Sequence, residues 1–204
     1  MIKNNFINIA RSISFNKGRG KTLKGNNKQK LPYLWLFTDS IKTSNPVKLT
    51  KSLPIKSGVV IRHYKSKNKE NIIRDILNIK KRKTLTVLIA GKYKRKLGVD
   101  GNHLPQWINN NKINQITSIS VHSGIDVRKS LNVKANLVFI SPVFPTSSHV
   151  SKQHLGTIKL GLLARLFKKD IIALGGINNK NIARLRSLPI AGCAGIDVFT
   201  EDLQ

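Results

Sequence analysis

Eight short apolar runs, separated by helical or loop-like segments, constrain the fold of this chain more than any other feature. The runs cover residues 33–39, 58–64, 85–91, 102–105, 116–122, 136–142, 170–176 and 194–199. Strands that are apolar along their whole length are typical of parallel sheets covered by helices. Eight such units predict an α/β fold, a (β/α)8 TIM barrel. The weak run at 102–105 leaves an open doubly wound sheet as the alternative.

The segments between the runs differ in helical character. Periodicity is clearest in residues 68–83, where isoleucines recur at helical spacing, and similar patterns lie at 161–169 and 179–188. After the third and fourth runs only 92–98 and 106–112 remain for a crossover. The sequence therefore predicts shortened helices. The barrel surface that they leave uncovered would allow a homo-oligomer.

The first 31 residues form a separate class of sequence. They hold eight Lys and Arg residues and no acidic one, and Asp39 is the first acid in the chain. Such composition predicts a flexible, disordered basic tail over residues 1–31, ahead of a barrel domain over residues 32–204. A transit peptide has a similar composition, so the tail is either a targeting signal or a plain extension.

The composition of the chain restricts the kinds of ligand and the cellular location to be expected. The 37 basic and 9 acidic residues give a formal net charge of +28, which favours anionic ligands. The lysines are scattered, which is typical of a solvated surface and does not favour a nucleic-acid interface. No apolar run approaches the roughly 18 residues of a membrane span. The single cysteine, Cys193, fits a reducing compartment, and we expect a cytoplasmic protein.

The polar residues of interest gather where the runs end. In a (β/α)8 barrel the carboxyl ends of the strands build the active site. His63, Lys65 and Lys67 follow the second run at alternate positions, so on a strand they would form a cationic row. Ser120 and His122 share one face of the fifth run. The candidate residues at the later ends are Thr146, Ser148, His149, Gly175, Gly176 and Thr200.

These ends suggest a pocket for a phosphorylated small molecule. Gly175 and Gly176 precede an expected helix start, where backbone N–H groups would face an anion. The loops after the seventh and eighth strands are the usual phosphate site of such barrels. His122 is the acid–base candidate, because the ordinary pKa of histidine lies near neutrality.

Several segments together resemble one family. "SVHS" (120–123), "ISPVFPTSS" (140–148), "IIALGGINNKNIARL" (171–185) and "AGCAGIDVF" (191–199) are similar to the motifs of the thiamine-phosphate synthase/TenI family. "LFTDS", "GVVIRHYKSK" and "GVDGNHLP" match its upstream strand motifs more weakly. The resemblance spans about residues 33–200. It implies a (β/α)8 barrel that acts in thiamine biosynthesis on a thiazole phosphate.

The cationic residues depart from the synthase pattern. The synthase joins hydroxymethylpyrimidine pyrophosphate to a thiazole phosphate, and its second strand carries a Gln-x-Arg-x-Lys row. We match that row to His63, Lys65 and Lys67, where lysine cannot reproduce the bidentate fork of arginine. The lysine that follows the "PTxT" motif of the synthase is replaced by His149.

The metal positions depart further. The synthase holds Mg²⁺ with an Asn-Asp pair after the third strand, and the matching residues are Ala90 and Gly91. Its second metal aspartate matches Ile108, while Asp100 lies nearby. We therefore predict no metal ligand and no cofactor, and Mg²⁺ enters only under the synthase hypothesis.

The preferred hypothesis is a TenI-like tautomerase. The resemblance places its acid–base histidine on His122, its phosphate grip on Gly175, Gly176 and Thr200, and hydroxyls on Thr146 and Ser148. One alternative is a true synthase with a rearranged metal site, in which Asp100 or substrate oxygens replace the lost ligands. Another, from a different class, is a non-catalytic protein that binds a phosphorylated thiazole or pyrimidine, or nucleic acid.

Overall fold

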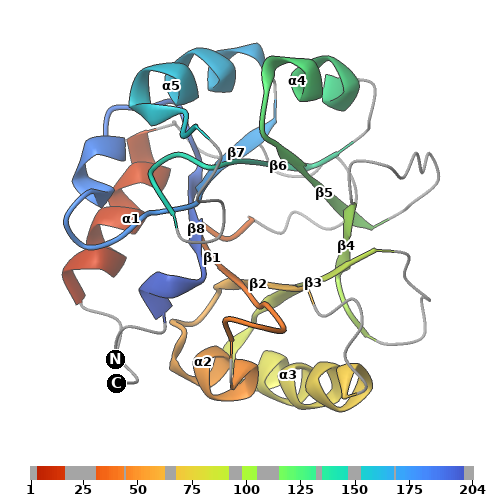
Figure 1. Ribbon diagram of the computed structural model, residues 1–204. Coiled ribbons are helices and arrows are strands. Elements are labelled where there is room, and N and C mark those ends of the chain that lie inside the picture. The colour runs from red at the N-terminus through yellow and green to blue at the C-terminus, as the bar shows by residue number, and fades with distance from the viewer. Residues whose placement is uncertain are drawn as a thin grey trace.

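The computed structural model describes residues 4–16, 31–43, 45–62, 68–91, 98–104, 115–131, 135–146, 153–167 and 169–199. Within them eight parallel strands form a closed barrel, in which each strand pairs with the next and β8 pairs with β1 (Figure 1). The strands are β1 (Leu34–Phe37), β2 (Gly58–Ile61), β3 (Thr86–Ala90), β4 (Gly101–Leu104), β5 (Ile116–Val121), β6 (Leu137–Ile140), β7 (Asp170–Leu174) and β8 (Gly192–Gly195). The predicted (β/α)8 barrel is thus confirmed, and the open-sheet alternative is wrong.

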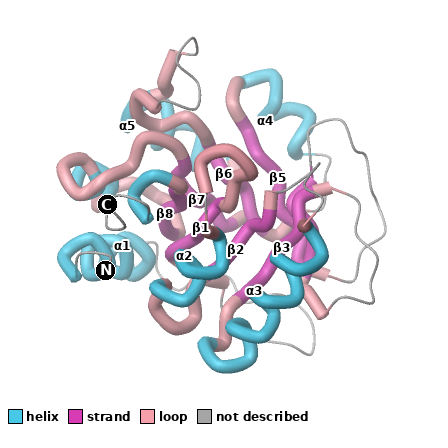
Figure 2. The backbone as a smooth tube through the Cα atoms, turned by 60° about the horizontal axis from the view of Figure 1, so that its bottom comes forward, coloured by secondary structure: helices cyan, strands magenta, loops and turns pink. Residues whose placement is uncertain are grey.

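Helices surround the strands, as Figure 2 shows. They are α1 (Asn4–Asn16), α2 (Pro46–Ser52), α3 (Lys69–Lys83), α4 (Gly124–Leu131) and α5 (Gly156–Leu166), with two 3₁₀ turns, η3 (Ile182–Leu185) and η4 (Asp197–Phe199). The short α2 begins with Pro46, and the Asn45 side chain caps it by accepting the Lys48 N–H at 2.8 Å. The crossover segments 92–97 and 105–114 lie outside the described residues.

Alternation along each strand separates two cores. One face contributes to the barrel interior, which contains Trp35, Phe37, Val60, Leu88, Ile116, Leu137, Phe139, Ile172 and Ala194. The other face packs against the helices; on β2, for example, Val59 and Ile61 belong to this outer core. The period of two is that of any β-strand. It decides which side chains enter the barrel mouth, the end formed by the carboxyl ends of the strands.

The N-terminal segment differs from its expectation. Residues 4–16 form α1 rather than a flexible tail, and their apolar side chains at positions 6, 9, 10 and 13 are buried. This i, i+3, i+4, i+7 spacing gives the helix one apolar face. The helix packs against β8, η3 and β1 (Figure 1). Residues 17–30 lie outside the described residues, and the proposed domain boundary after residue 31 stays a prediction.

The end of the barrel also differs in detail. The eighth strand is Gly192–Gly195, not 194–199, because small residues are needed where it meets its neighbours: a Cβ on Gly192 would collide with the Tyr33 backbone. The apolar residues that follow lie in the buried turn η4. The helix expected over 179–188 is reduced to η3, because the Asn181 side chain bonds back to the Asn178 N–H and the Gly176 carbonyl, and Pro189 follows closely.

Among the described residues, none of the helices has the length and apolar character that a membrane crossing would require.

Candidate active site

His122 follows β5 on the interior-facing side and is half-buried. Its Nδ1 lies 2.9 Å from the backbone carbonyl oxygen of Ser141 and 3.0 Å from Ser141 Oγ. A carbonyl oxygen only accepts hydrogen bonds, so Nδ1 carries the hydrogen and Nε2 is the basic nitrogen of the neutral ring. The His122 backbone N–H donates to Asp126 Oδ2 at 2.9 Å, which fixes the backbone where α4 begins.

A second histidine, His103 on β4, lies at the centre of the barrel. Its Nδ1 is 2.9 Å from Ser118 Oγ and its Nε2 is 3.2 Å from Ser120 Oγ. Edge-on contacts with Phe37 and Phe139 enclose the ring. Burial, with smaller effects of the nearby Arg62 and His122 charges, lowers the pKa of His103 to about 3. His103 is therefore neutral near pH 7 and orients hydroxyls, while the half-buried His122 is the more accessible of the two histidines.

Ser120 lies where it was expected, on the same side of β5 as His122. Its hydroxyl binds His103, so the structure links Ser120 to a histidine that the sequence analysis had not selected. His103 and His122 are also close enough for their charges to interact. The ends of β4, β5 and β6 thus bring together two histidines and three serines, Ser118, Ser120 and Ser141.

The two glycines after β7 have a structural reason. Gly175 and Gly176 have φ angles of +96° and +67°, which residues other than glycine rarely adopt. A Cβ on Gly176 would collide with the carbonyl oxygens of Phe144 and Pro145, and the Phe144 N–H donates to the Gly175 carbonyl at 3.1 Å. The glycines therefore let the loop after β6 lie against the end of β7. A role in holding phosphate stays a prediction.

The N–H groups that follow these glycines are less open than expected. Asn178 Oδ1 accepts from the backbone N–H groups of Lys180 and Asn181, and Asn181 Oδ1 accepts from the Asn178 N–H at 2.9 Å. Asn181 Nδ2 also donates to the Gly176 carbonyl. The N–H groups of Asn178, Lys180 and Asn181 are thus bonded within the segment itself. Anion binding at the start of this segment stays a prediction.

The remaining predicted residues are only partly placed. Thr146 is half-buried in the loop after β6. The others lie outside the described residues: His63, Lys65, Lys67, Ser148, His149 and Thr200.

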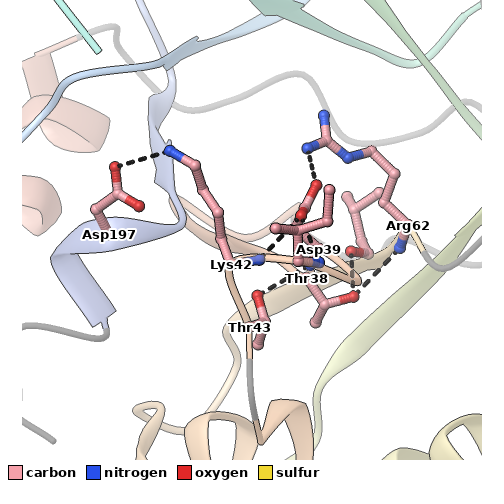
Figure 3. A network of polar contacts seen from close by, with 8 residues as sticks. Thr38, Asp39, Lys42, Thr43, Arg62 and Asp197 are labelled. Atoms are coloured by element: carbon pink, nitrogen blue, oxygen red, sulfur yellow. Dashed lines mark hydrogen bonds and ion pairs between the residues drawn. The ribbon is translucent and has the colours of Figure 1, made fainter. Parts of the chain in front are cut away.

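An ionic network at the ends of β1, β2 and β8 was missed by the sequence analysis (Figure 3). Arg62 Nη2 donates to Asp39 Oδ2 at 2.6 Å, and Lys42 Nζ lies 3.8 Å from Asp197 Oδ2. Counting by twos from the interior residue Val60 would have found Arg62, because it shares the parity of that face. The row matched to the family began at His63, which has the opposite parity.

Asp39 is held as a carboxylate. Burial raises its pKa, but the backbone N–H groups of Ile41 and Lys42 and the Arg62 guanidinium outweigh burial, so the pKa lies below its ordinary value. Arg62 and Asp39 are thus a charged pair at the mouth at neutral pH.

The described residues do not fit the Mg²⁺ that the family resemblance implies. The tip of β3 carries Ala90 and Gly91, which have no side-chain oxygen. Asp100 precedes β4, at the opposite end of the barrel, where it pairs with Lys80 at 2.7 Å and accepts the Val87 N–H. The hypothesis that Asp100 replaces a metal ligand is therefore wrong. Within the described ranges no three or more His, Cys, Asp or Glu side chains cluster to hold a metal.

The closed barrel with polar groups at the carboxyl ends of its strands defines a (β/α)8-barrel enzyme. A family model described as thiamine monophosphate synthase (TMP-TENI) matches residues 40–199. The chain belongs to this family, which acts in thiamine biosynthesis.

Individual relatives agree with the family. A thiamine-phosphate synthase homologue of Aquifex aeolicus (strain VF5) is 27% identical over 184 residues, which cover 84% of this chain and 99% of that protein. The thiamine-phosphate synthase of Latilactobacillus sakei subsp. sakei (strain 23K) is 31% identical over 88 residues, 42% of this chain and 39% of that protein. The fold is similar to that of thiamine phosphate pyrophosphorylase from Pyrococcus furiosus, with a TM-score of 0.64, 17% identity, and coverage of 85% of this chain and 90% of that one.

Proposed function

We propose that this protein is a metal-independent isomerase that moves a proton on a carboxylated thiazole phosphate, with His122 as the acid–base group. The observation that carries the proposal is the contact between His122 Nδ1 and the Ser141 carbonyl oxygen. That contact fixes the hydrogen on Nδ1 and makes Nε2 the nitrogen that exchanges protons.

The reaction needs no other reagent. Nε2 of neutral His122 takes a proton from one position of the thiazole, and the resulting imidazolium returns a proton at another. The Ser141 carbonyl oxygen accepts the Nδ1 hydrogen bond in both states, so the ring need not turn between the two transfers. Substrate and product have the same composition, and the histidine ends as it began.

An anchor for the substrate anions completes the proposal. Gly175, Gly176 and Thr200 would hold the phosphate, as the family resemblance implies. Ser120, Thr146, Ser148 and His149 would line the same mouth, and the cations His63, Lys65 and Lys67 would lie beside it. Arg62 adds a guanidinium at the described end of β2. We propose the cytoplasm as the location, on the same grounds as the sequence analysis.

The second candidate is thiamine-phosphate synthase itself. Two observations favour it: a relative matched over 99% of its own length carries that name, and Arg62 lies on the interior-facing side of β2, where it supplies a guanidinium that the row of His63, Lys65 and Lys67 lacks. A guanidinium grips a pyrophosphate better than lysine does. Against it stands the poor fit of the described residues to Mg²⁺.

One set of incubations separates these functions. The full chain is mixed with hydroxymethylpyrimidine pyrophosphate and thiazole phosphate, with and without Mg²⁺, and separately with the carboxylated thiazole phosphate. Products are identified by mass spectrometry and NMR. We expect thiazole tautomers to interconvert without added metal. Thiamine phosphate formed only with Mg²⁺ would instead establish the synthase.

His122→Ala tests the acid–base role in the same assay. We expect turnover to fall by about 10²–10⁴-fold, the usual contribution of general acid–base catalysis, while the affinity for inorganic phosphate is retained. His154→Ala is the matched control, because His154 is an exposed histidine. Equal turnover in the His122 and His154 variants would contradict the proposal. Phosphate binding without any product in the wild type would indicate a non-catalytic binding protein.

A further inference from the structure

Asp39 is the centre of a tightly bonded turn after β1. Its Oδ1 accepts the backbone N–H of Ile41 at 2.9 Å and that of Lys42 at 3.1 Å, and its own N–H donates to Thr43 Oγ1 at 2.9 Å. Oδ1 is therefore committed to the backbone, and only Oδ2 reaches the neighbouring strand. The turn holds this second oxygen in one place.

Oδ2 binds the guanidinium of Arg62 (Figure 3). Arg62 Nη2 donates to it at 2.6 Å, and the Arg62 backbone N–H donates to Thr38 Oγ1 at 3.2 Å. Both the backbone and the guanidinium of Arg62 are thus held by residues at the end of β1. A guanidinium has five N–H donors in a planar fork, so one bond to Asp39 leaves donors for a bidentate anion.

The same turn also reaches β8. Lys42 Nζ lies 3.8 Å from Asp197 Oδ2, on the other side of Asp39 from Arg62 (Figure 3). Asp197 begins η4, three residues before Thr200. The β1 turn therefore lies between the cationic end of β2 and the predicted phosphate end of β8.

We infer that Asp39 is a positioning residue, which holds the Arg62 guanidinium ready for an anionic group of the substrate. This inference rests on the proposed function, since it requires the mouth to bind a phosphorylated ligand. Pre-organisation lowers the cost of binding, because the long arginine side chain need not be ordered when the ligand arrives. Asp39 itself would not touch the substrate.

Asp39→Asn separates positioning from folding. The amide oxygen of asparagine still accepts the Ile41 and Lys42 N–H groups, so the turn can persist, while the ion pair with Arg62 is lost. We expect the Kd for inorganic pyrophosphate, measured by calorimetry, and the KM for the active substrate to rise about tenfold, as for the loss of one charge-assisted bond. We expect kcat to change less than about twofold, since the acid–base group is untouched.

Asp100→Asn is the matched control. One carboxylate oxygen of Asp100 forms an ion pair and the other accepts a backbone N–H, as in Asp39. The exposed fractions of the side chains are also similar: 21% for Asp100 and 22% for its partner Lys80, against 20% for Asp39 and 30% for Arg62. Asp100 lies at the opposite end of the barrel. Both variants should lower the thermal midpoint by similar small amounts, but only Asp39→Asn should weaken pyrophosphate binding.

A double variant tests whether Asp39 acts through Arg62. On an Arg62→Met background, Asp39→Asn should cause no further loss of pyrophosphate affinity, because the group that it positions is gone. Unchanged or tighter binding in Asp39→Asn alone would overturn the inference and leave the proposed function standing. A wild-type chain that binds neither pyrophosphate nor thiazole phosphate would overturn both.

Discussion

At the scale of single residues, His103 makes the stability of the folded state depend on pH. The unfolded chain protonates this histidine near its ordinary pKa of 6.5, whereas burial lowers the pKa in the folded state to about 3. Between these values the unfolded chain binds one more proton. The folded state therefore loses stability as pH falls below 6.5, at about 1.4 kcal/mol per pH unit for this one group.

Urea unfolding of the wild type and of His103→Gln at pH 7, 6 and 5 checks this sign. The wild type should lose stability more steeply than the variant as pH falls, because glutamine can bond Ser118 or Ser120 but does not titrate. Parallel pH curves would mean that His103 is not held neutral.

Residue-level prediction from the sequence succeeded where strand parity was counted within one run. It placed Ser120 and His122 on the same side of the fifth strand. It missed Arg62 because the cationic row was started at His63, one position out of phase with Val60. It could not find His103 as a partner of Ser120, because this contact depends on how β4 and β5 align as neighbouring strands, and sequence spacing does not give that alignment.

At the scale of elements, α1 is the part that the sequence analysis misjudged. Counting charge over 31 residues concealed the apolar spacing of residues 6, 9, 10 and 13, which buries one face of this helix. The strands were easier to predict, since a buried parallel strand is marked in the sequence by an unbroken apolar run. The bounds of β8 were not predictable from apolar content, because small residues form that strand.

Two isoleucines test the docking of α1. Ile13 on α1 is fully buried and Ile158 on α5 is 80% exposed. Ile13→Ala should lower the free energy of unfolding by about 2–5 kcal/mol, the range for buried large-to-small changes. Ile158→Ala should change it by less than about 0.5 kcal/mol. Urea denaturation compares them, and equal costs would show that α1 does not pack as described.

At the scale of the whole molecule, the net charge of +28 opposes compaction. Raising NaCl from about 0.1 M to about 1 M shortens the screening length from about 10 Å to about 3 Å. The thermal midpoint should therefore rise with salt. A variant with the exposed residues Lys48, Lys81 and Lys159 changed to Gln should be less salt-dependent. A midpoint that falls with salt in both proteins would show that attractive ion pairs dominate instead.

The docking of α1 also has a consequence for the order of events during synthesis. The helix is made before any strand, but the surface that receives it includes β8, the last strand to be made. β1 is made early, but η3 and β8 are made late, so the apolar face of α1 is not fully covered until β8 pairs with β1 and closes the ring. A growing chain would thus expose part of the apolar face of an amphipathic helix for most of its translation. Such a surface is a target for a ribosome-associated chaperone.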